Sequence, residues 1–267
     1  MGMGHIRLLR FMPMIAGRVI LFPLSVTISA QYDHDIELHQ FEGNMGKSRI
    51  GMTVARRGNT IEGGHYFYQK FLQDIPIAGS VTDSHITLTE PGGGTFHLRF
   101  VDNGSEGSQS LDFENSVGMD GNWTSAGGSR TYSVSLRGAT ILSVADARRR
   151  YSEVTRESDQ TFERHVQSFW HATLRGDRAA AAKFISYPLR VNFPDHSRKS
   201  YQSPTAVLSA WNNLFTPTMM AKLREALPHD MFVHDSMAML GDGEEWFDDK
   251  GLAVLNVLSP SAKLSTR

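Results

Sequence analysis

Five carboxylates fall within the thirteen residues from Met239 to Gly251, where they could form a cation-binding loop or an acid–base pair. A calcium loop needs oxygen ligands at alternate positions, a glycine at the sixth position and a glutamate at the twelfth. Counted from Asp242, these two positions hold Phe247 and Ala253, so the calcium pattern fails. Transition metals favour histidine, and this stretch contains none. The acids and glycines are typical of tight turns between short strands, so we expect no metal here, and we expect no metal and no cofactor elsewhere in the chain.

Glu244 is the acid of this stretch that we keep as a catalytic candidate. Glu244 and Glu245 lie on a predicted strand, so one should face inward and the other outward. A carboxylate in an apolar cavity has a raised pKa and can act as a general acid or base. The alternative, which we favour, is an exposed carboxylate at the mouth of a hairpin.

In the second half of the chain, aspartate and histidine are adjacent at Asp195–His196, His229–Asp230 and His234–Asp235. An aspartate that fixes the tautomer of a histidine beside a cavity is a common acid–base arrangement. However, neighbours in a strand point to opposite faces, and such pairs often lie at the ends of loops. We add Asp195, His196 and His234 to Glu244 as catalytic candidates.

Aromatic side chains offer candidate sites for binding. Tyr66 and Tyr68 share one face of a predicted strand. We expect them to fill a barrel, because barrel interiors need large side chains; the alternative is an exposed recognition surface. In the second half of the chain, Tyr187, Trp211 and Trp246 are expected to line the hollow of an α+β domain and hold an apolar ligand, or simply to fill that hollow.

The elements that would position these residues differ between the two halves. Strand-length alternating runs recur about every eight to twelve residues between 36 and 137, separated by Gly, Asn or Asp, and Arg57–Asn59 reads as a hairpin turn. We predict an all-β domain over 31–140, an antiparallel meander curled into a small barrel or sandwich. The charged residues 141–157 lack this alternation and predict a linker.

From Ser158 the spacing of apolar residues becomes helical. One stripe predicts the first helix: Phe162, Val166, Phe169, Trp170 and Thr173. Ser203–Pro204 and Thr216–Pro217 each combine a cap with a proline in the first turn, which is the usual start of a helix. Three short strands follow. We predict a segregated α+β domain over 158–260 and a tail over 261–267.

The composition and the first thirty residues indicate where the protein works. The chain has 267 residues, a net charge of −1 and no cysteine, which excludes disulfides and thiolate metal sites. No basic run stands out, so we expect no nucleic-acid partner. A basic start, the apolar run Val19–Val26 and the small residues Thr27–Ala30 have the order of an export signal cleaved after Ala30. The apolar run is too short for a membrane anchor, so we expect a periplasmic or secreted protein.

Two motifs resemble known families. Gly64–Lys70, followed by Ile75, Ile77, Ile86, Leu88 and Glu90, resembles the strands of uncharacterised exported bacterial domains built as lipocalin-like β-barrels. Residues 174–193 and 237–247 resemble a nuclear-transport-factor-like (NTF2-like, or cystatin-like) α+β cone. The resemblance implies the fold of both halves. It places no catalytic residue, because cone folds host enzymes, binding proteins and structural modules alike.

These observations lead to one favoured function and three alternatives. We predict a non-enzymatic binding protein of the bacterial envelope whose partner is an envelope protein or a small apolar ligand. A cone-fold hydrolase or isomerase would instead use the candidate aspartate, histidine and glutamate residues. An inhibitor or immunity protein for a cell-wall enzyme would insert the acidic loop Gly241–Glu245 into a basic cleft. A structural role would make the C-terminal domain a homodimer interface.

Overall fold

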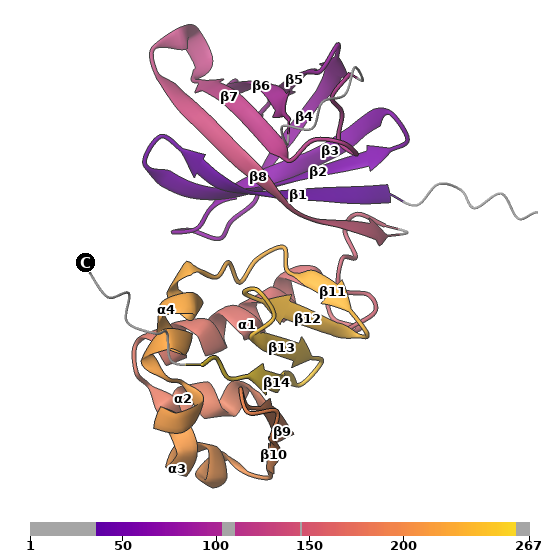
Figure 1. Cartoon of the computed structure of the whole chain (residues 1–267). Coiled ribbons are helices and arrows are strands. Elements are labelled where there is room, and N and C mark those ends of the chain that lie inside the picture. Colours follow the sequence, from indigo (N-terminus) through magenta and orange to yellow (C-terminus); the bar gives the residue numbers. More distant parts are fainter. Residues whose placement is uncertain (1–35, 103–109, 145, 260–267) are drawn as a thin grey trace, which may run out of the picture. The chain divides into compact units, whose positions relative to one another are not determined.

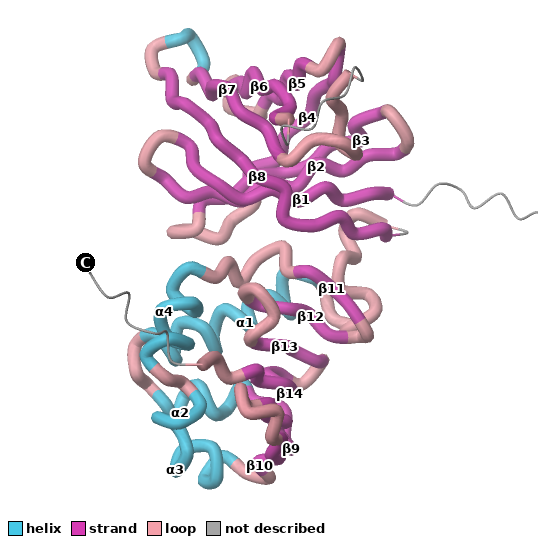
Figure 2. Tube along the Cα trace, viewed as in Figure 1, coloured by secondary structure: helices cyan, strands magenta, loops and turns pink. Residues whose placement is uncertain are grey.

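The computed structural model describes residues 36–102, 110–144 and 146–259 (Figures 1 and 2). The predicted export signal over 1–30 and the tail over 261–267 lie outside these residues. The described part of the chain contains a closed eight-stranded barrel, a six-stranded sheet and four α-helices. No helix in these ranges is long and apolar enough to cross a membrane.

The N-terminal region is an antiparallel β-barrel, as the alternating runs predict. Its strands pair in sequence order, and β8 returns to pair with β1 from Ile36↔Val144 onward, which closes the barrel. The strands are β1 (Ile36–Met45), β2 (Ser48–Arg57), β3 (Thr60–Tyr68), β4 (Ile75–Thr82), β5 (His85–Thr89), β6 (Thr95–Val101), β7 (Gly118–Thr124) and β8 (Thr131–Val144). Gly58 has a φ of 57° in the predicted hairpin turn between β2 and β3.

The core of the barrel is filled by side chains. Met52, Tyr66 and Phe96 are fully buried members of one apolar cluster. The Tyr66 ring meets the Phe96 ring edge-on at 5.0 Å, and the Tyr66 hydroxyl donates to Glu90 Oε2 at 2.5 Å. Tyr66 is therefore a core residue, as we expected.

Part of the sheet face opposite to Tyr66 is also buried. Phe67 lies opposite Gly51 in the pairing of β2 with β3, and its ring covers that glycine. The other side of the Phe67 ring packs edge-on against His229, with ring centroids 4.3 Å apart. This contact joins the barrel to the segment between α4 and β11.

We expect Gly51→Ala to destabilise the protein by about 1–3 kcal/mol, because a Cβ at Gly51 would lie 2.3 Å from the Phe67 ring and force it to move. Urea unfolding would measure the loss. Gly92→Ala is the control, because a Cβ there has nothing within 4 Å, and its effect should stay within about 0.5 kcal/mol. Equal effects of the two substitutions would contradict the packing described.

The C-terminal region combines a mixed sheet with helices. Its elements are α1 (Asp159–Leu174), α2 (Arg178–Ala181), a 3-10 turn (Ala182–Phe184), β9 (Ile185–Asn192), β10 (Arg198–Tyr201), α3 (Pro204–Leu214), α4 (Pro217–Glu225), β11 (Phe232–His234), β12 (Met237–Leu240), β13 (Glu245–Asp248) and β14 (Gly251–Asn256). The strand order is β10-β9-β14-β13-β12-β11, and β14 pairs with β9 in parallel.

Sequence signals account for the helices. The side chains of Ser203 and Thr216 cap α3 and α4 by accepting backbone N–H groups, as predicted, and Ser158 caps α1 in the same way. The predicted stripe of α1 is buried, and Phe169 meets Phe247 of β13 with ring centroids 5.4 Å apart. This contact seats the helix on the sheet.

The predicted linker over 141–157 is corrected by the structure. Residues 141–144 belong to β8, and Arg150 and Tyr151 are buried in the turns that follow. The backbone N–H groups of both residues donate to the Asp159 carboxylate at 2.8 and 3.3 Å. The many charged residues of this segment favoured a linker, but Arg150 is buried because its charge is balanced by Asp230, which is distant in sequence.

Candidate functional site

A row of polar side chains crosses three neighbouring strands of the barrel. The strand registers pair Gln40 of β1 with Thr53 of β2, and Thr53 with His65 of β3. All three side chains contact the same residue of the C-terminal region, Asp230. The barrel therefore presents one polar row to one aspartate.

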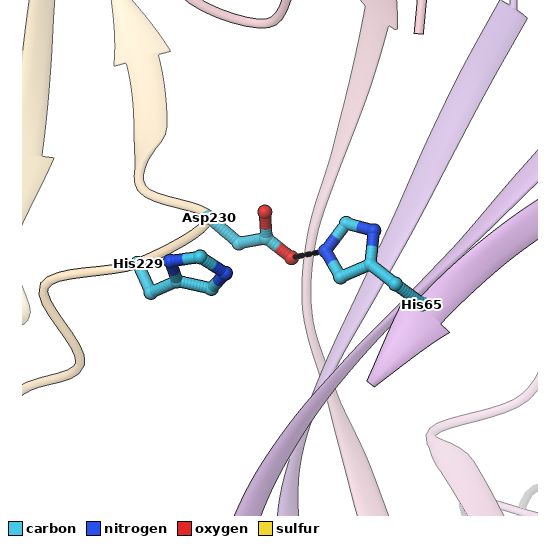
Figure 3. Close-up of side chains that lie close together, drawn as sticks. All are labelled: His65, His229 and Asp230. Atoms are coloured by element: carbon cyan, nitrogen blue, oxygen red, sulfur yellow. Dashed lines mark hydrogen bonds and ion pairs between the residues drawn. The ribbon is translucent and has the colours of Figure 1, made fainter. Parts of the chain in front are cut away.

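Asp230 is the centre of the site (Figure 3). It lies between α4 and β11 with a φ of 53°, and its side chain is only 10% exposed. One carboxylate oxygen accepts from the Thr53 hydroxyl at 2.5 Å and lies 2.6 Å from His65 Nε2. The other oxygen lies 3.3 Å from the guanidinium of Arg150, which is 4% exposed. Gln40 donates its amide to the Asp230 carbonyl.

The adjacent His229 stands between two further carboxylates. Its Nε2 lies 2.7 Å from Asp74 Oδ1, and its Nδ1 lies 2.7 Å from Glu163 Oε2. The other oxygen of Glu163 accepts from the Tyr151 hydroxyl at 2.7 Å and from the Asp230 backbone N–H at 2.9 Å. Asp74 Oδ1 also lies 3.4 Å from His65 Nε2, which links the two histidines.

The charges of the cluster shift the pKa values of its histidines and of Asp230. Burial by itself lowers the pKa of a histidine, but Asp74 and Glu163 outweigh burial and raise the pKa of His229 to about 10. Asp230 likewise outweighs burial and raises the pKa of His65. Burial favours a neutral Asp230, yet Arg150 and His65 hold its pKa well below its usual range. Histidines with a raised pKa therefore alternate with carboxylates in this cluster.

The cluster lies in a half-open cleft with a volume of about 1190 Å³. Leu38, Ala55 and Phe71 contribute apolar surface, whereas Gln160 and Arg164 of α1 contribute polar surface. Six carboxylates line the cleft, against three arginines. The lining is therefore acidic whenever the two histidines are neutral. A second cavity of about 930 Å³ shares His229 and Asp230 in its lining.

Two groups of side chains have the spacing of metal ligands in the described ranges. His65, His229 and Asp230 each offer one ligand atom, and these atoms lie within 4.8 Å of one another. The other group is Glu37, His39 and Glu114. There the guanidinium of Arg56 lies 3.0 Å from His39 and 2.8 Å from Glu114, so a cation of the protein already stands among the donor atoms.

The predicted catalytic histidine and aspartate residues do not form a buried site. Asp195 and His196 are exposed in the turn between β9 and β10, where Asp195 accepts hydrogen bonds from Ser197. His234 ends β11 and is also exposed, 3.5 Å from the adjacent Asp235. Each pair contacts its own loop, which is the alternative that sequence placement suggested.

The acidic stretch forms turns, as predicted, but its two glutamates differ from expectation. Glu244 and Glu245 are both buried, whereas we expected one to face outward and favoured exposure of Glu244. The reason is that Glu244 lies before β13, where its carboxylate turns back to accept the Asp242 N–H at 2.6 Å. Burial and the neighbouring Glu244 raise the pKa of Glu245 well above its usual value.

Glu245→Gln is expected to change how stability depends on pH. The folded state holds Glu245 protonated, so stability is greatest below the unfolded pKa near 4.5 and falls as pH rises toward the higher folded value. The variant should lack this loss and exceed the wild type in stability at pH 8. Urea melts between pH 4 and 8 would measure it; parallel curves for the two proteins would contradict the assignment.

The aromatic candidates lie in packed surroundings, and neither cavity has them in its lining. Tyr68 packs against Tyr66 with ring centroids 5.7 Å apart, and Trp211 stacks on Phe215 at 4.2 Å. Tyr187 donates to the Ala182 carbonyl, and Trp246 Nε1 donates to the Gly243 carbonyl.

The partners of the His229–Asp230 pair were not predicted from the sequence: His65, Asp74, Glu163 and Arg150. His65 and Asp230 are 165 positions apart, and only the closed barrel and its contact with the C-terminal region bring them together. The one local signal was the adjacency of His229 and Asp230.

Comparisons with known proteins add no family. No protein-family model matches the chain, and neither the curated proteins nor the solved structures contain a match. The function is therefore inferred from the sequence and from the geometry of the cluster.

Proposed function

We propose that this chain is an exported, non-enzymatic binding protein of the bacterial envelope, periplasmic or secreted, whose binding site is the cleft around His229 and Asp230. The order of basic, apolar and small residues over 1–30 supports export. The cleft supports binding, because it gathers convergent polar groups in a half-open hollow of ligand size.

One observation carries the proposal: paired, largely buried ionisable groups converge in an open cleft, whereas none of the aromatic candidates lines that cleft. Burying charges is costly unless they are paired, so such a cluster is retained where its charges are used. The ligand that fits is a small polar or charged one. This chemistry replaces the apolar ligand that the aromatic residues suggested.

The alternatives have less support. The candidate catalytic residues Asp195, His196 and His234 are exposed in separate turns, so they do not favour an enzyme. An inhibitory loop at Gly241–Glu245 would need free acids, but both of its glutamates are buried and Asp242 pairs with Lys222 at 2.7 Å.

We also propose a specific fold for each of the two domains. A closed eight-stranded antiparallel barrel supports a lipocalin-like N-terminal domain. The mixed sheet, with α1 packed on it through Phe169 and Phe247, supports a nuclear-transport-factor-like cone as the C-terminal domain. A homodimer through this domain is a further proposal, which light scattering after size exclusion would test.

The binding proposal is tested by thermal shift with small polar compounds, divalent cations and a small-molecule fraction of envelope extract. A ligand at 100 times its Kd adds about 2.7 kcal/mol to the stability of the folded state. We expect at least one of these to raise the Tm of the wild type and to raise that of Asp74→Ala less. Asp120→Ala is the matched control, because Asp120 forms an exposed ion pair with Arg137 outside the cleft lining. No stabilisation by any of them would contradict the proposal.

A further inference from the structure

We propose that the cleft binds one divalent transition-metal cation, such as Zn²⁺, through His65, His229 and Asp230, with Asp74 as a fourth ligand. This inference rests on the proposed binding function and names the chemical class of the ligand. Two imidazoles and two carboxylates form a donor set that suits zinc and its neighbours.

The donor atoms are already close to the spacing that an ion requires. Zinc binds nitrogen and oxygen at about 2.0–2.2 Å, so two ligand atoms of a tetrahedral ion lie about 3.4 Å apart. His65 Nε2 and Asp74 Oδ1 are separated by 3.4 Å. His65 Nε2 and Asp230 Oδ2 are 2.6 Å apart, and His229 Nε2 and Asp74 Oδ1 are 2.7 Å apart. Small side-chain movements would admit an ion, because Asp74 is 54% exposed and His65 is 22% exposed.

Glu163 supplies the outer partner that a metal-binding histidine needs. Metal-ligating histidines almost always donate their second ring N–H to a carboxylate or carbonyl, which fixes the tautomer. Glu163 Oε2 lies 2.7 Å from His229 Nδ1, so a metal ion would bind at Nε2 by displacing the proton that faces Asp74. Glu163 Oε1 accepts the backbone N–H of Asp230. One buried glutamate therefore positions two consecutive ligands.

Charge and access favour a dication here over the other histidine–carboxylate group. The cleft is lined by six carboxylates and three arginines, so its carboxylates outnumber its arginines, and the open cleft gives a cation an entry path. Around His39 the guanidinium of Arg56 contacts both the imidazole and Glu114, whereas in the cleft Arg150 lies 3.3 Å from Asp230 Oδ1, the carboxylate oxygen that does not face His65. We therefore assign the metal to the His65 site alone.

The first test is equilibrium dialysis of the metal-stripped protein against ZnCl₂ at pH 7.5, with metal content measured by mass spectrometry. We expect one zinc ion per wild-type chain. His65→Ala should lower the affinity by at least 100-fold, more than loss of an outer partner usually costs. His85→Ala is the control, because His85 is an exposed histidine of the barrel outside the cleft lining, and it should bind as the wild type does.

Two further measurements do not depend on whether His65→Ala folds. Co²⁺ added to the wild type should give the intense visible absorption of a tetrahedral site. Glu163→Gln should weaken binding by about 10- to 100-fold and alter that spectrum. Tyr151→Phe is its control, since it removes the hydroxyl that donates to Glu163 Oε1 and accepts the Met231 N–H, but it leaves the Glu163–His229 contact in place.

Two outcomes would overturn the metal site. One is wild-type protein that takes up no zinc, and the other is zinc uptake that His65→Ala leaves unchanged. Either result leaves the cleft open to other polar ligands, so the thermal-shift test with Asp74→Ala separates failure of the metal site from failure of the binding function.

Discussion

Asp230→Ala is expected to lower the free energy of unfolding by about 3–5 kcal/mol, because it removes one partner of a buried ion pair. Arg150, with 4% exposure, would lose the carboxylate that balances its charge. The hydroxyl of Thr53 and the imidazole of His65 would lose their acceptor as well. Urea or guanidinium unfolding at neutral pH would measure the loss.

Two matched variants make this result specific. Asp120→Ala breaks an exposed ion pair with Arg137 and should cost less than about 1 kcal/mol. The double variant Asp230→Ala with Arg150→Met leaves no unbalanced buried charge, so it should be more stable than Asp230→Ala alone. If the double variant lost as much stability as the two single variants lose together, Asp230 and Arg150 would not be coupled.

Phe247→Ala is expected to cost about 3–5 kcal/mol, which is the usual effect of emptying a fully buried aromatic position. Phe247 has no exposed surface, and its ring packs against Phe169 of α1. The cavity would loosen the contact that holds this helix on the sheet. Chemical unfolding would measure the change.

Phe71→Ala provides the comparison for Phe247→Ala. Phe71 is 59% exposed, so its removal should change stability by only about 0.5 kcal/mol. If both phenylalanine variants unfolded at the same denaturant concentration as the wild type, the packing described for the C-terminal core would be wrong.

Local patterns predicted the elements of this fold well. The alternating run Thr95–Val101 is β6, and the stripe that contains Phe162 and Val166 is the buried face of α1. These predictions succeeded because the period of apolar residues reflects one exposed and one buried face. The prediction of a linker over 141–157 differs from the structure, because the local pattern cannot show that Arg150 contacts Asp230.

The candidate site was predicted poorly for the same physical reason. His229 and Asp230 were noticed as neighbours, but their partners come from β3, from the turn after it and from α1. Glu244 was kept as a catalytic acid on the assumption of a regular strand, whereas a turn places its carboxylate against the Asp242 N–H. Strand register and long-range contacts decide both cases, and neither is visible in local spacing.

Barrel closure also limits how this protein can aggregate. Because β8 pairs with β1, the barrel offers no unpaired outer strand for another chain to extend. The outermost strands of the C-terminal sheet are short: β10 has four residues and exposes Arg198 and Lys199, and β11 has three. Intermolecular sheet growth would have to bury the charges of β10 or begin from the three residues of β11, so fibril formation from the folded protein is disfavoured.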